Sequence, residues 1–151
     1  MDAFLNFAKA TVSTTYDAAA VTIVLTSGGA ARLPAVPFNA VWWNATDYAD
    51  PSDDPNREIV RVTGKASETL TITRAQEGTS ASTKNTAAKT YLLIAPLTLL
   101  TVNQINLSMP VSNAGDPNSV LDGNPGRPCY DTTNVRTWFK TTAAGTLTGW
   151  Q

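Results

Sequence analysis

The stretch EIVRVTGKASETLTITRAQEGT, residues 58–79, contains two short runs that alternate apolar and polar side chains as β-strands do. The apolar positions of the two runs are Val60, Val62, Leu70 and Ile72. The GKAS segment between the runs predicts a tight turn in which Gly64 can take a positive φ. We therefore expect a β-hairpin here, in a stretch that carries no catalytic motif.

Three further segments have the composition of strands, because threonine recurs in them beside valine, isoleucine or aromatic residues. They are VTIVLTSGG (21–29), FNAVWWN (38–44) and KTYLLIAP (89–96). One helix is expected at 101–107, where Thr101 can cap the N-terminus and Val102 and Ile105 form a narrow apolar face. Pro110 ends it. A helix this short is marginal alone, so we expect it to dock onto another surface.

A change of composition predicts a domain boundary near residue 111. Residues 110–128 are dense in Pro, Gly, Asn, Asp and Ser, and the segments PCYDTT and RTWFKTT after them predict a hairpin with a turn at Asn134. The expected fold is mainly β: an N-terminal β-sandwich or barrel-like domain over 1–110, ending in the short helix, and a small C-terminal β-hairpin module over 111–151. This module has too few apolar residues to be stable alone, which predicts self-association.

The composition excludes several classes of function. The chain has 151 residues, no histidine and one cysteine, so it can hold neither a Ser–His–Asp or Cys–His arrangement nor a histidine metal site. Cys129 is interpreted as a small buried hydrophobe. The net charge of −1 gives no electrostatic basis for binding nucleic acid or an anionic membrane. The apolar stretch 91–100 is too short to span a bilayer, and the N-terminus lacks the basic region of a signal peptide.

An acidic loop, TDYADPSDDPN (46–56), is the densest group of oxygen ligands in the chain. It contains Asp47, Asp50, Asp53 and Asp54. The loop lacks the spacing of an EF-hand, and its Asp-Pro and Ser-Asp-Asp steps are typical of turns, so we expect neither a metal nor a cofactor. A carboxylate hydrolase or lyase acting on polysaccharide is an alternative, and it predicts loss of activity when these aspartates are replaced.

The tryptophans offer either binding faces or packing. Trp42 and Trp43 could stack on sugars, but neighbouring strand residues point to opposite faces, which favours packing in the core or at an interface. Trp138 and Trp150 lie in the undersized C-terminal module, where we expect them to anchor an interface.

Two ordered sets of motifs run through the chain. The first is PFNAVWW, DPNREIVRVTG, TLTITRAQEGT and KTYLLIAPLT, and it resembles a β-rich module of tailed-bacteriophage virion proteins. Its matched positions are Glu58, Ile59, Val60, Val62, Thr63, Thr71, Thr73, Arg74, Gln76, Glu77, Gly78 and Thr79. The second set, over roughly 115–151, is similar to a short module near the ends of phage fibre and tail proteins. It matches at Gly123, Pro125, Gly126, Asp131, Thr132, Gly149 and Trp150.

The resemblance implies a structural component of a phage particle, in the neck, the tail or the base of a short fibre, made in the bacterial host cytoplasm and located in the virion. It implies no catalytic residue, so we expect no enzyme. We expect a homotrimer that also docks to other virion proteins and binds no nucleic acid or membrane, because hairpins intertwined around a threefold axis would cover exposed strand edges. The alternative is a capsid-decorating or host-glycan-binding module.

The candidate assembly residues are Arg74, Glu77, Ile105, Trp138 and Trp150. Arg74 and Glu77 lie close together in the RAQEGT loop, where they can pair with each other, with the acidic loop or across a subunit boundary. Because surface ion pairs are individually weak, a loop tether within the subunit is the favoured interpretation. Ile105 belongs to the expected helix, which either lines the oligomer axis or docks on another virion protein.

Overall fold

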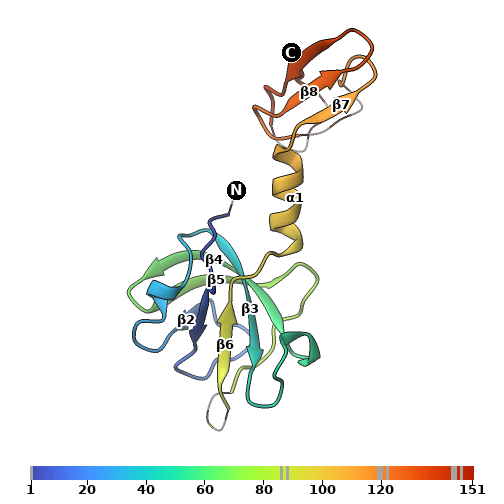
Figure 1. Cartoon of the computed structure of the whole chain (residues 1–151). Helices are drawn as coiled ribbons and strands as arrows, with labels where there is room; N and C mark the ends of the chain where they lie inside the picture. The colour runs from blue at the N-terminus through green and yellow to red at the C-terminus, as the bar shows by residue number, and fades with distance from the viewer. Residues whose placement is uncertain are drawn as a thin grey trace. The chain divides into compact units, whose positions relative to one another are not determined.

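The computed structural model describes residues 2–85, 87, 89–118, 121, 123–143, 146 and 148–151, and it is mainly β with one α-helix (Figure 1). The chain divides into two compact units, Asp2–Thr98 and Leu99–Gln151. The division precedes the helix, whereas the sequence placed the boundary near residue 111. Hydrogen bonds at the C-terminal end of the helix join it to the C-terminal unit.

The N-terminal unit is an antiparallel sheet of six strands in the order β1-β6-β3-β4-β5-β2. Its edge strands meet where Val12 and Leu25 form a bridge and the Thr26 amide donates to the Thr11 carbonyl at 2.9 Å. The sheet is therefore curled into a barrel. The strands are β1 (Lys9–Thr11), β2 (Thr22–Val24), β3 (Phe38–Asn44), β4 (Glu58–Ala66), β5 (Thr69–Gln76) and β6 (Tyr91–Ile94), with short 3-10 helices η1 (Ala30–Arg32) and η2 (Pro51–Asp53) between them.

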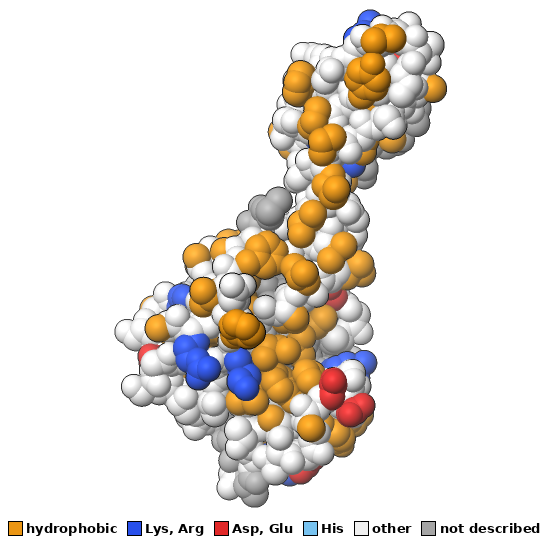
Figure 2. Space-filling model, in the orientation of Figure 1, with side chains coloured by type: hydrophobic (Ala, Val, Ile, Leu, Met, Phe, Trp, Pro, Cys, Tyr) orange, Lys and Arg blue, Asp and Glu red, His pale blue; other side chains and the backbone are white. Residues whose placement is uncertain are grey.

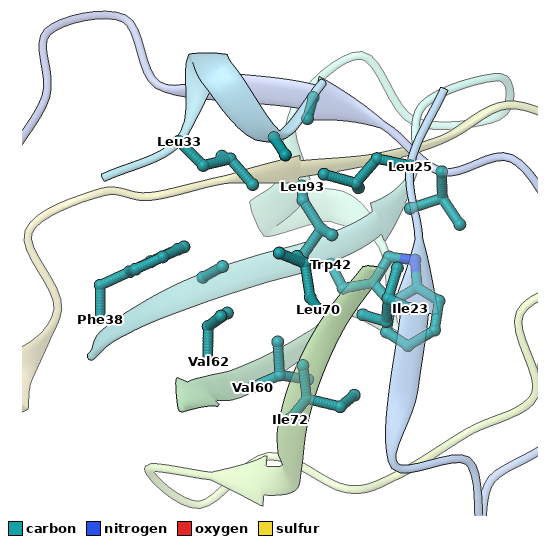
Figure 3. Close-up of a cluster of buried hydrophobic side chains, with 14 of the residues drawn as sticks. Ile23, Leu25, Leu33, Phe38, Trp42, Val60, Val62, Leu70, Ile72 and Leu93 are labelled. Carbon is teal, nitrogen blue, oxygen red and sulfur yellow. The ribbon is translucent and has the colours of Figure 1, made fainter. Parts of the chain in front are cut away.

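The core of the barrel consists of side chains that point inward from neighbouring strands (Figure 3). They include Ile23, Phe38, Trp42, Val60, Val62, Leu70, Ile72 and Leu93, all of them buried. The apolar positions predicted for the 58–79 hairpin are thus confirmed as core. Each fully buried side chain of this size stabilises the fold by about 1.5–3 kcal/mol relative to exposure.

The turn of the hairpin differs from the prediction. Strand β4 continues through Gly64 to Ala66, and the reversal is made after it, where Ser67 takes a left-handed φ of 49°. The prediction that Gly64 makes the turn is wrong. A Cβ at Gly64 would lie 3.0 Å from Oγ1 of Thr71, and the strand register shifts between Val62 and Gly64. Glycine is therefore needed there for close approach of two strands at a bulge.

The outer surface of the barrel has two different sides. On β5, Thr71 and Thr73 are exposed, as expected for the threonine-rich strand. On the neighbouring strands β3 and β6, the outward residues Val41, Leu92 and Ile94 are instead apolar and half-buried, and Val41 lies opposite Ile94 in the register. Figure 2 shows hydrophobic side chains gathered over these two strands. One side of the barrel is thus suited to water and the other to apolar contact.

The C-terminal unit contains α1 (Leu99–Ser108) and a three-stranded sheet of β7 (Val111–Asn113), β8 (Pro128–Asp131) and β9 (Arg136–Phe139). The predicted hairpin is confirmed, since β8 and β9 pair antiparallel around the turn at Asn134. Strand β7 was not predicted, and it pairs parallel to β8. Among the described residues, no helix is long and apolar enough to cross a membrane.

Contacts at its C-terminal end explain why the helix belongs to this unit. The Asn124 amide donates to the Leu107 carbonyl at 3.0 Å, and Nε of Arg127 donates to the Met109 carbonyl at 2.7 Å. Carbonyls at a helix end lack partners within the helix, so these bonds join α1 to the loop before β8. Thr101 lies inside α1 and is buried, so the prediction that it caps the N-terminus is wrong.

Adjacent residues of β6 give a direct test of the barrel. Leu93 is fully buried in the core, whereas Leu92 points outward and is half-buried. We expect Leu93→Ala to lower the free energy of unfolding by about 2–5 kcal/mol, because a cavity adds to the lost transfer energy. Leu92→Ala is the matched control and should cost clearly less in urea titrations. Equal losses for the two variants would contradict the assigned faces of β6.

Candidate functional site

Arg74 is bound within the N-terminal unit. Its Nε and Nη2 donate to the two carboxylate oxygens of Glu58, each at 2.6 Å. The same guanidinium donates to the carbonyls of Asp17 at 2.9 Å and Ser82 at 2.8 Å. Arg74 is thus a tether inside the subunit, as the sequence favoured, but its carboxylate is Glu58 and not Glu77.

The pair is part of a buried charged cluster beside Trp42. The guanidinium carbon of Arg74 lies 5.0 Å from the centre of the Trp42 ring, and Nζ of Lys84 lies 5.7 Å from it. Lys84 is fully buried, 3.8 Å from the Glu58 carboxylate, and donates to the Asn56 carbonyl. Burial lowers the pKa of Lys84, against the opposing effect of Glu58. The cluster joins β4 and β5 to the loops on either side of them.

The other charged side chains of the 58–79 stretch also hold neighbouring segments. Nη1 and Nη2 of Arg61 donate to the Asp2 carboxylate at 2.6 and 2.8 Å. Lys65 donates to the carbonyls of Ala30, Leu33 and Pro34. The Glu68 carboxylate accepts from the amides of Gly28 and Ala30, and the Glu77 carboxylate accepts from the Asn39 side chain. Charge on this hairpin therefore serves the fold of the barrel.

The acidic loop makes turns, as expected. The Asp50 carboxylate accepts from the Ser52 amide at 2.7 Å, and this bond lowers the pKa of Asp50. Asp54 is buried and accepts from the amides of Asn44 and Asn56, both at 2.8 Å. Among the described residues, no group of three or more acidic or cysteine side chains is placed to hold a metal ion.

The Trp42–Trp43 pair is buried, which confirms the packing interpretation. Trp42 belongs to the core, and Nε1 of Trp43 donates to the Tyr48 carbonyl at 3.3 Å. Neither ring presents a face to solvent on which a sugar could stack.

The N-terminal apolar patch is a surface that the sequence interpretation missed. We define it as Phe4, Leu5, Phe7, Ile94, Pro96 and Leu97. Of these, Leu5, Phe7, Ile94 and Pro96 line a hollow of about 330 Å³ together with Ala8, Lys9 and Ala95. The side chain of Phe7 is 97% exposed. The available signal was the apolar run in MDAFLNFAKA ahead of β1, which the sequence interpretation considered only as a possible targeting segment.

In the C-terminal unit, the two tryptophans have different roles. Trp150 is buried, and its Nε1 donates to the Leu121 carbonyl at 2.9 Å, so it packs within its own unit. Trp138 is half-buried, and the Arg136 guanidinium carbon lies 4.4 Å from the centre of its ring. Cys129 is buried, which confirms its interpretation as a small hydrophobe, and burial raises the pKa of its thiol.

The C-terminal unit also exposes apolar side chains. Tyr130 on β8 and Phe139 on β9 are about half exposed, and the register places them on one face of the sheet. On α1, the exposed apolar residues are Leu99, Leu100 and Val102, and the exposed Met109 follows the last residue of the helix. Leu99, Val102, Asn106 and Met109 form a stripe with the 3-4-3 spacing of a coiled-coil seam, and Leu100 lies outside it. Ile105 is half-buried and lies outside this stripe.

Comparison with protein-family models and with curated proteins finds no match for this chain.

Breaking the Arg74–Glu58 pair should strongly lower the free energy of unfolding. We expect Arg74→Met to lower the free energy of unfolding by about 3 kcal/mol, because it leaves the buried Glu58 carboxylate without its bidentate partner. Arg57→Met is the matched control, since Arg57 is exposed, donates only to nearby carbonyls, and should change stability by about 0.5 kcal/mol or less. Urea unfolding measures both. Similar stabilities for the two variants would show that the cluster is not a stabilising anchor.

The hydrogen bonds of Asp131 predict that the C-terminal unit loses stability in acid. Its carboxylate is buried and accepts from the Asn134 side chain at 2.8 Å and from the amides of Thr133 and Gly115, each at 2.9 Å. These bonds, that of Asn134 first, hold the pKa of Asp131 well below its usual range. The folded pKa lies below the unfolded value of about 3.9, so the stabilisation is present above that pH and decreases as the pH falls below it.

We therefore expect the indole N–H resonances of Trp138 and Trp150 to report loosening of this unit as the pH falls from 6 to 3. Asp131→Asn should be less stable at neutral pH and should lose less on acidification. Asp116→Asn, at an exposed aspartate of the same unit, is the control and should keep the wild-type pH response. An unchanged pH response in Asp131→Asn would exclude Asp131 as the source.

Proposed function

We propose that this protein is a structural component of a bacteriophage particle, in the neck, the tail or the base of a short fibre, which acts by self-assembly and by docking to other virion proteins. The phage part of the proposal comes from the motif resemblance in the sequence, and the observation that supports assembly and docking is how charged and apolar side chains are distributed. The charged groups of the 58–79 hairpin are bonded within the barrel, while both units expose large apolar side chains. Such surfaces are typical of proteins that bind other proteins.

The C-terminal unit exposes surfaces suited to self-association, which we propose to be threefold. Its sheet exposes Tyr130 and Phe139 on one face. The stripe along α1 and the following Met109 has coiled-coil spacing, and its Asn106 would set register in a helix bundle. A ten-residue helix is too short to associate stably by itself, so the sheet must contribute to the contact. A homotrimer around these surfaces would bury apolar area that one copy leaves in water.

A host-glycan-binding module is the second candidate, because Tyr130 and Phe139 place two half-exposed rings on one sheet face. Aromatic faces of this kind can stack on sugars. Because Trp42 and Trp43 are buried, binding of an oligosaccharide would be detected as a change in the fluorescence or NMR signals of Tyr130 and Phe139.

The native mass of the purified chain tests the proposal. We expect a multiple of three protomers for residues 1–151, and loss of this threefold association when the chain ends at residue 110. Light scattering coupled to size exclusion gives both masses. A ring of six or twelve that survives truncation would instead favour the neck or the tail tube. A monomer would favour the decorating alternative, in which the partner surface belongs to another protein.

A further inference from the structure

The loop at residues 3–7 is fixed at both ends yet presents apolar side chains to solvent. At its start, Asp2 is buried and held by both terminal nitrogens of Arg61, at 2.6 and 2.8 Å. At its end, Ala8 is buried and its carbonyl accepts from the Ala95 amide at 3.1 Å. Between these anchors Phe4, Leu5 and Phe7 remain exposed. The loop is thus preorganised, and binding through it would cost little conformational entropy.

Phe7 contributes little to the packing of its own barrel. Its side chain is 97% exposed, and its backbone takes a left-handed φ of 57°. A bulky residue is uncommon in that region, which asparagine and glycine occupy more readily. The protein therefore holds a strained backbone and an exposed ring at one position, a combination that gives the isolated unit no evident benefit.

The hollow beside Phe7 is apolar and of a size to receive a phenyl ring. It measures about 330 Å³ and is lined by Leu5, Ile94, Pro96 and Phe7 itself. Lys9 is the charged residue of this lining, and it is exposed, so its stem can cover the hollow while its ammonium reaches water. A projecting ring and an apolar hollow thus lie side by side in one patch.

The exposed apolar area matches one side of a stable interface. The exposed fractions are 51% for Phe4, 46% for Leu5, 97% for Phe7 and 64% for Leu97. With about 200 Å² for each fully exposed large side chain, these residues offer on the order of 500 Å². One partner in a standard interface buries about 800 Å², of which somewhat more than half is apolar. The patch alone supplies that apolar share.

We propose that the N-terminal apolar patch binds the same patch of a second copy of this chain, with Phe7 of each copy in the hollow of the other. A contact that uses one patch on both subunits has twofold symmetry, and adjacent ring and hollow make the patch self-complementary. The inference rests on the proposed function, because it names the partner for a protein proposed to self-assemble. It adds a twofold contact between barrels to the threefold contact of the C-terminal units.

The test is the full-length chain carrying Phe7→Asn. Asparagine removes the ring and suits the left-handed backbone, so thermal stability should be unchanged or higher, while twofold association should weaken about tenfold or more. Val21→Ser is the matched control, because Val21 is 62% exposed on the same unit and lies outside the patch. Sedimentation equilibrium over a range of concentrations measures the association of the unsubstituted protein and of the two variants.

The outcomes separate this inference from the proposed function. If both hold, the full chain is a dimer of trimers, Phe7→Asn gives trimers, and truncation at residue 110 gives dimers. A trimer that is unaffected by Phe7→Asn overturns the inference alone. A dimer that Phe7→Asn converts to a monomer and truncation leaves intact supports the inference and overturns the threefold assembly. A monomer at all concentrations overturns both, and the patch would then bind another protein or another part of the same chain.

Discussion

The bidentate bond between Arg74 and Glu58 is the interaction on which the N-terminal unit depends most. It lies at the end of the hairpin, under the Trp42 ring, and continues through Lys84 to the loops after β1 and β5 and before β4. A buried charge of either sign is costly alone, so each member requires the others. The loops are therefore fixed by a polar anchor at one end of a core that is otherwise apolar, and hydrophobic packing alone would not select their positions.

Outside the apolar core, charged and apolar side chains of the N-terminal unit have different environments. Here the ionisable groups of the hairpin are bonded to carbonyls, amides and one another, and apolar groups reach solvent on β3, β6 and the loop at residues 3–7. A hollow of about 320 Å³ lined in part by Asn56, Arg57 and Ser80 is polar, but Arg57 there donates to carbonyls of its own loop.

The C-terminal unit shows how a small module is held together with little core. Its buried residues include Asp131 and Lys140 beside Cys129 and Trp150. Lys140 donates to the carbonyls of Thr146 and Thr148, while Asp131 accepts several bonds around the β8–β9 turn. Hydrogen bonds to charged groups are stronger than neutral ones, so they partly replace the apolar packing that a short chain lacks. Exposed Tyr130 and Phe139 remain available for contact with other molecules.

Alternation and turn chemistry in the sequence were enough to determine the strands at 58–63 and 69–74 and the C-terminal hairpin with its turn at Asn134. They also determined the burial of Val60, Val62, Leu70 and Ile72 and the turns of the acidic loop. These features depend on residues close in the chain. Only the tertiary structure decided that the sheet closes as a barrel, that Gly64 serves a bulge, that Arg74 pairs with Glu58, and that α1 belongs with β7–β9. Each of these depends on contacts between distant segments, which local periodicity does not encode. The exposure of Phe7 is of the same kind, since an apolar residue in a sequence gives no sign of whether the fold will cover it.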